Sequence, residues 1–117
     1  MTIVRLHTGP RMSQAVIHGS TVYLAGQVAD QAKGKSVADQ TREILATIER
    51  LLAEAGSDKT RILSATIYLV DMATFGEMNA VWEAWVPAGH APARATVEAK
   101  LAAPGYTVEI ACIAARD

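Results

Sequence analysis

Residues 92–110, PARATVEAKLAAPGYTVEI, contain two runs typical of β-strands on either side of a turn at Pro104-Gly105. Side chains alternate between the two faces of a strand, so Glu109 points the same way as its apolar neighbours two and four residues further on. An unpaired buried carboxylate is costly, and arginine is the residue best shaped to grip one with two parallel hydrogen bonds. We therefore predict that Arg94, on a neighbouring strand, is the partner of Glu109.

The chain before this stretch alternates strand-like and helix-like segments. We expect a short edge strand, a β-hairpin, a helix, a strand and a second helix, at residues 3–6, 14–25, 36–55, 61–70 and 74–86. Gly56 is placed to end the first helix, and Thr74 with Glu77 fits a capping box at the start of the second. The predicted order is β-β-α-β-α-β-β in a single α+β domain, residues 1–117.

The segment 61–70 reads as a central strand with two largely apolar faces. One face carries Leu63, Ala65, Ile67 and Leu69, and the other carries Ile62, Tyr68 and Val70. Two helices can cover only one face of a sheet of about five strands. We therefore expect a second copy of the chain to cover the other face, which makes the protein a homo-oligomer.

Composition narrows the class of protein. Half of the 117 residues are apolar, a fifth are charged and the net charge is −1, which argues against electrostatic binding of nucleic acid or of an anionic membrane. No apolar run approaches the roughly 20 residues of a membrane span, and the N-terminus lacks the apolar core of a signal peptide, so we expect a cytoplasmic protein. The single cysteine, Cys112, excludes an internal disulfide and is expected to be an inert core thiol.

The sequence resembles the Rid/YjgF family of reactive-intermediate deaminases, often labelled endoribonuclease L-PSP, over nearly its whole length. Besides residues 92–110, the segments that carry the resemblance are Gly9-Pro10, Ser13-Gln14-Ala15, Ala25-Gly26-Gln27, Thr41-Arg42, Ala53-Glu54-Ala55-Gly56, and Asp71-Met72 with Phe75, Met78 and Asn79. The resemblance implies a chorismate-mutase-like α+β fold and a homotrimer whose sheets form a central barrel. It also implies hydrolysis of 2-imino acids and enamines such as 2-aminoacrylate, without metal or cofactor, in clefts between subunits.

The resemblance further implies a role for five residues. Arg94 matches the arginine that holds the substrate carboxylate, and Glu109 matches the glutamate that orients or activates water. Gly26 and Thr96 match positions whose backbone lines the pocket, and Asn79 matches a helix asparagine near it. The chain differs from many deaminating members at two positions. Met12 stands where they have a tyrosine, and Ala25 stands where they have a serine.

Other interpretations remain open at this point. From the residues alone, Arg94 and Glu109 could form an interface ion pair without a substrate. The chain could also be a sensor that binds a 2-oxo acid through Arg94 without turnover, which Met12 and Ala25 favour. A ribonuclease is disfavoured by the net charge, the few aromatic residues and the lack of a basic stripe. The stretch 42–50, with four charged residues, is interpreted as a solvated helix face.

Overall fold

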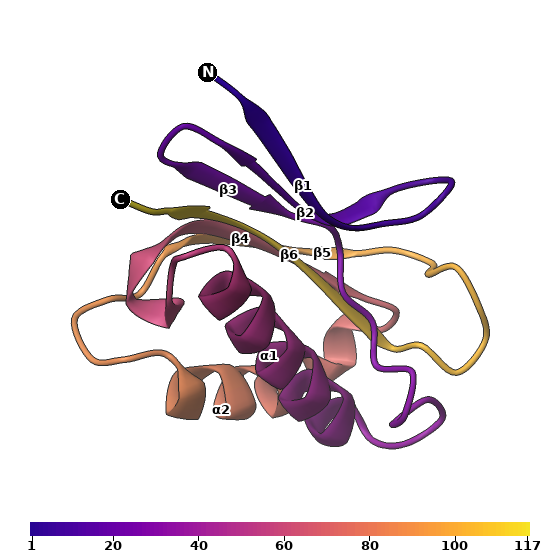
Figure 1. The fold of residues 1–117 in the computed structure, drawn as a ribbon. Helices are drawn as coiled ribbons and strands as arrows, with labels where there is room; N and C mark the ends of the chain where they lie inside the picture. Colours follow the sequence, from indigo (N-terminus) through magenta and orange to yellow (C-terminus); the bar gives the residue numbers. More distant parts are fainter.

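In the computed structural model, which describes residues 1–117, two helices lie on one face of a six-stranded mixed sheet (Figure 1). The strands are β1 (Ile3–Thr8), β2 (Ser13–His18), β3 (Thr21–Leu24), β4 (Ile62–Leu69), β5 (Ala93–Glu98) and β6 (Val108–Ala115), and the helices are α1 (Val37–Glu54) and α2 (Phe75–Trp85). The spatial order is β1-β2-β3-β6-β4-β5. Only β4 and β5 pair in parallel, and the other neighbours pair antiparallel. The α+β architecture is therefore confirmed, with one strand more than the predicted order.

The predicted order left out the short edge strand expected at residues 3–6. This strand forms as β1, extends to Thr8 and pairs with β2. At the opposite edge lies β5, so both edges of the sheet are available to other chains. Neither helix is long and apolar enough to cross a lipid bilayer.

The core fills the space between the sheet and the helices. Apolar residues at three- and four-residue spacing on α1 face the sheet, where the helix lies against β6 and β3. The largest fully buried apolar residues are Ile44, Leu45, Ile48, Leu52, Ile67, Leu69, Met78 and Ile110. Ser36 caps α1 by accepting a hydrogen bond from Asp39 N at 3.1 Å, and Gly56, with φ of 81°, follows its C-terminus as predicted.

The capping box predicted for the second helix is wrong. A 3₁₀ turn at Met72–Thr74 precedes α2, and Asp71 caps that turn by accepting a hydrogen bond from Ala73 N at 2.9 Å. The Thr74 hydroxyl donates to the Asp71 carbonyl, and Glu77 Oε2 accepts from Ala38 N at 2.8 Å. Ala38 lies in the first turn of α1, where the helix dipole favours a negative charge. Glu77 therefore stabilises the N-terminus of α1 instead of the start of its own helix.

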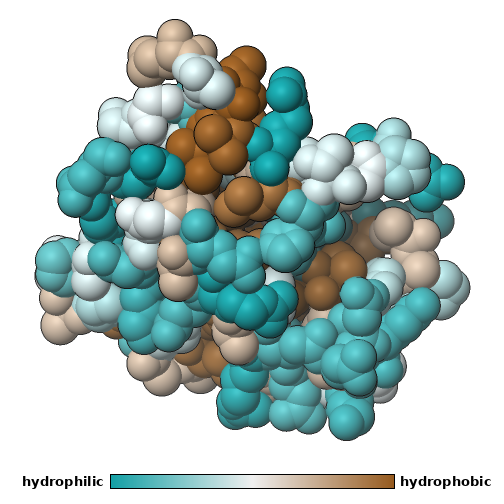
Figure 2. Space-filling model, viewed as in Figure 1, coloured by the Kyte–Doolittle hydropathy of each residue, from teal (hydrophilic) through white to brown (hydrophobic).

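The predicted faces of residues 61–70 also need a correction. A register shift lies between Ile62 and Ser64 where β4 pairs with β6, so Ile62 joins Ala65 on the buried face and Leu63 is 53% exposed. The face away from the helices nevertheless remains apolar, because Tyr23, Leu63, Val70 and Val97 are all exposed. Figure 2 shows further hydrophobic surface in the upper part of the view, where β1, β2 and β3 lie.

Gln40, a fully buried residue of α1, joins the helix to two loops. Its Nε2 donates to the carbonyls of Gly105 and Lys35 at 2.8 and 3.2 Å, and its Oε1 accepts from Thr107 N at 3.0 Å. The Lys35 carbonyl and the Thr107 N–H have no other hydrogen-bond partner, whereas the Gly105 carbonyl also accepts from Gly34 N at 3.0 Å. The Gln40 side chain therefore completes the hydrogen bonding of both loops.

We expect Gln40→Leu to lower the free energy of unfolding by about 2–4 kcal/mol, because it leaves the part-buried Lys35 carbonyl and Thr107 N–H without partners. Urea unfolding at fixed protein concentration measures the change. The matched control is Gln31→Leu, at an exposed glutamine whose side chain makes no hydrogen bond, and it should change stability by less than about 0.5 kcal/mol. Equal stability of the two variants would contradict the role given to Gln40.

Candidate functional site

Arg94 lies on the edge strand β5 and points to the side of the sheet that the helices cover. It pairs with the buried Ala65 of β4, and its Nη1 donates to Asn79 Oδ1 on α2 at 2.7 Å. The guanidinium carbon lies 5.7 Å from the ring centroid of Phe75 and 5.5 Å from that of Trp82. Two aromatic rings and one hydrogen bond thus fix the guanidinium, while most of its five N–H donors stay free for an anion.

Thr96 follows Arg94 on the same face of β5, beside the buried Ile67. Its hydroxyl is buried and has no hydrogen-bond partner within the chain. A buried polar group without a partner is unfavourable, and such groups concentrate where a ligand or another chain completes the structure. The structure therefore brings Arg94, Asn79 and Thr96 together at one edge of the sheet.

Glu109 lies on β6, directly opposite Tyr68 of β4, on the face away from the helices. Its carboxylate forms no hydrogen bond and no ion pair within the chain, and the residue is partly exposed. Gly26 leaves the space for it, because a Cβ at that position would lie 2.2 Å from Glu109 Oε2. A larger residue at position 26 would force this carboxylate to move.

Gln27 keeps Gly26 beside Glu109, and it is a residue that sequence reasoning did not place in the site. Its backbone exchanges two hydrogen bonds with Ile110, at 2.9 and 3.1 Å, just after Glu109 in β6. Its side-chain Nε2 donates to Gln14 Oε1 on β2 at 2.8 Å and to the Ala25 carbonyl at 3.0 Å. The sequence indicates this role only by a polar residue, Gln27, just after the apolar strand that ends before Gly26.

The predicted pairing of Arg94 with Glu109 is wrong. Their strands are not neighbours, because β4 lies between β5 and β6. Arg94 pairs with Ala65 and Glu109 with Tyr68, two positions an odd number of residues apart on β4, so the two charges lie on opposite faces of the sheet. A sequence pattern assigns faces within each strand, but it does not say which strands are neighbours.

Cys112 is fully enclosed in β6, where burial raises the pKa of its thiol to about 12. The thiol is therefore protonated at neutral pH and is not a nucleophile. No group of three or more histidine, cysteine, aspartate or glutamate side chains lies close enough to hold a metal ion.

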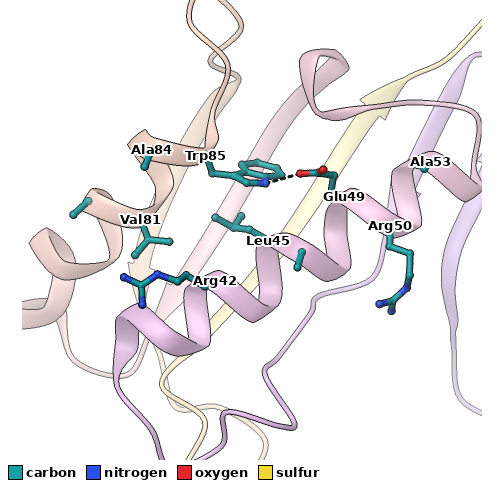
Figure 3. A pocket seen from close by; sticks show the side chains of 10 residues that line it. Arg42, Leu45, Glu49, Arg50, Ala53, Val81, Ala84 and Trp85 are labelled. Carbon is teal, nitrogen blue, oxygen red and sulfur yellow. Dashed lines mark hydrogen bonds between the residues drawn. The ribbon is translucent and has the colours of Figure 1, made fainter.

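The largest cavity of the chain, about 720 Å³, lies elsewhere, between α1 and α2 (Figure 3). None of the five predicted site residues lines it. Its lining includes Arg42, Glu49 and Arg50, from the stretch that the sequence pattern indicated to be only a solvated face.

Comparison with known proteins identifies the family of this chain. The sequence profile described as "Endoribonuclease L-PSP" matches residues 2–116. The chain belongs to this family. The RutC family protein YoaB of Escherichia coli is 46% identical over 115 residues, which cover 98% of this chain and 99% of YoaB. The crystal structure of NMB1025, a YjgF family protein of Neisseria meningitidis, is 48% identical with a TM-score of 0.96, and the match covers 100% of this chain and 97% of NMB1025.

A more distant member of the family carries a name that states a reaction. A protein of Rattus norvegicus named 2-iminobutanoate/2-iminopropanoate deaminase is 32% identical over 107 residues, covering 87% of this chain and 77% of that protein. Closer relatives such as YoaB are named only by family.

Proposed function

We propose that the protein hydrolyses 2-imino acids and their enamine tautomers to 2-oxo acids and ammonia, in clefts between the copies of a homotrimer. The observation that carries this proposal is the setting of Arg94, whose guanidinium is held by Asn79 and two aromatic rings with donors to spare. A fixed, planar cation of this kind suits the carboxylate of a small acid. Family membership and the names of the mammalian relatives support the same reaction.

The chemistry requires little from the protein. Arg94 holds the substrate carboxylate, and Glu109 accepts a proton from a water molecule whose oxygen attacks the imine carbon. The addition breaks the C=N π bond, and its electron pair goes to the nitrogen, which takes up a proton. The carbinolamine that results loses ammonia as the new C–O bond becomes a carbonyl, and the proton of the hydroxyl leaves. Water is the only co-reactant.

The opposite placement of Arg94 and Glu109 supports a site shared between subunits. Because the sheet separates the two groups within one chain, a small substrate can meet both only if each comes from a different copy. The free edge strands β1 and β5 and the exposed apolar residues Tyr23, Leu63 and Val97 provide the surface for association.

We therefore expect sedimentation equilibrium to give the mass of three chains at micromolar concentration. Val97→Glu, which places a charge on the exposed apolar face, should dissociate the trimer and abolish imine hydrolysis together. Ala73→Glu, an exposed position outside this face, is the matched control and should stay trimeric. An active monomer would contradict the intersubunit location of the site.

The decisive experiment for the reaction couples the protein to an amino-acid oxidase that generates 2-imino acids in the presence of semicarbazide. Semicarbazide traps imine that has not been hydrolysed, so a deaminase lowers the amount of semicarbazone formed. We expect suppression for several amino-acid side chains. No suppression for any of them would reject the deaminase.

Met12 and Ala25 favour one alternative, a protein that binds a 2-oxo acid without turning it over, because they replace polar groups of many active family members. Calorimetric titration with pyruvate and 2-oxobutanoate separates the two functions when the semicarbazide assay is negative. Binding that depends on Arg94 without hydrolysis would establish the sensor.

A further inference from the structure

The groove between α1 and α2 has the properties of a second ligand site, separate from the residues assigned to imine hydrolysis. Its volume of about 720 Å³ lies within the range of pockets that hold small organic molecules. Seven of its ten lining residues are hydrophobic. It lies on the helical side of the molecule, so association through the opposite face of the sheet leaves it accessible.

Small side chains keep the groove open. Ala46 and Ala53 lie two turns apart on α1, and Ala80 and Ala84 lie one turn apart on α2, so each pair follows one face of its helix. All four alanines are exposed, although helix positions of this kind usually carry polar side chains. Leu45, Val81 and Trp85 also contribute to the apolar lining (Figure 3). An exposed apolar concavity of this form suits the hydrocarbon part of a ligand.

The charges around the groove favour an anion. Figure 3 shows Arg42 extending from α1 towards α2. Its side chain is 63% exposed and its only partner is the exposed Asp39, at 3.0 Å, a pair weak enough to be exchanged for a ligand. Glu49, by contrast, is already engaged, because Trp85 Nε1 donates to it at 2.9 Å and Lys59 Nζ lies 3.5 Å away. Arg42 is therefore a cation held only by one exposed aspartate, and the carboxylate in the lining already has partners. Arg50 also lines the groove, but Figure 3 shows its side chain extending away from α2.

We propose that this groove binds a small amphipathic anion, a carboxylate on a linear or flat apolar body. The carboxylate pairs with Arg42, and the apolar body lies along the four alanines towards the ring of Trp85. The twelve residues from Arg42 to Ala53 span about 16 Å of helix, enough for an acyl chain of about eight to ten carbons. A partner helix is the less favoured occupant, since the volume matches that of a single small ligand.

Titration of the intact protein with octanoate, and separately with octanol, tests this proposal. Amide chemical shifts locate the site, and calorimetry gives the dissociation constants. We expect saturable binding of one octanoate per chain, with shifts at Arg42, Ala46, Ala80, Ala84 and Trp85. Octanoate should bind about threefold to fivefold more tightly than octanol, as a solvent-exposed ion pair allows. No saturable binding, shifts confined to other surfaces, or equal affinities for the two probes would overturn the proposal.

Two variants test the residues separately. Arg42→Ala should reduce octanoate affinity to the level of octanol, whereas Lys35→Ala, the same loss of charge on an exposed loop, should leave it unchanged. Ala84→Glu should weaken octanoate binding about tenfold or more, because it fills the groove and adds a negative charge. Its control is Ala73→Glu, at an exposed position outside the groove. Octanoate affinity unchanged in both Arg42→Ala and Ala84→Glu would place the ligand elsewhere.

Imine hydrolysis gives an independent readout, because the groove contains no residue assigned to that reaction. All four variants should keep the hydrolytic activity of the unmodified protein. Failure of the groove proposal therefore leaves the proposed deaminase untouched, and the reverse also holds.

Discussion

Replacing Arg94 with alanine should reduce kcat/KM for 2-imino acid hydrolysis by roughly 10²–10³-fold, because the variant loses charge-assisted hydrogen bonds to the substrate carboxylate. The fold should persist, since Arg94 is exposed and lies on an edge strand. The semicarbazide assay measures the loss, and circular dichroism with sedimentation checks that the fold and the oligomeric state match those of the unmodified protein.

Arg94→Lys is the matched control for charge. It keeps the cation but loses the planar fork, so we expect it to recover only a small part of the activity. Asn79→Ala should raise KM more than it lowers kcat, because Asn79 orients the guanidinium through its 2.7 Å hydrogen bond. An Arg94→Ala variant that hydrolyses imines at the unmodified rate would remove this residue from the site.

Glu109→Gln should lower kcat by roughly 10²–10⁴-fold, the range expected when a general base is removed. Gly26→Ala should have a related effect through the same carboxylate, because its new methyl group would displace Glu109 Oε2 from a position only 2.2 Å away. A displacement of this size can cost about 10²-fold in rate.

A double-mutant cycle separates this mechanism from general damage. Adding Gly26→Ala to Glu109→Gln should cause little further loss, because both changes act on one group. Gly76→Ala is the control substitution, since a Cβ there meets nothing within 4 Å. Losses that multiply in the double variant would show that Gly26 acts independently of Glu109.

Local patterns in the sequence were enough to predict several elements of this fold. The helical spacing of apolar residues predicted α1. The apolar residues on both faces of residues 61–70 predicted a central strand and indicated a surface for another chain. These are local patterns, and they hold because burial of an apolar stripe requires a fixed period along the chain. The Arg94, Thr96 and Asn79 cluster was also anticipated, although only through the family resemblance.

The tertiary structure decided what depends on neighbours distant in the sequence. It placed β4 between β5 and β6, with a register that puts Arg94 and Glu109 on opposite faces of the sheet. It shifted Ile62 into the core through a register shift, and it gave Glu77 to the N-terminus of α1. Strand order, register and cross-helix contacts follow from the packing of the whole chain, and a period of two or 3.6 residues carries no information about them.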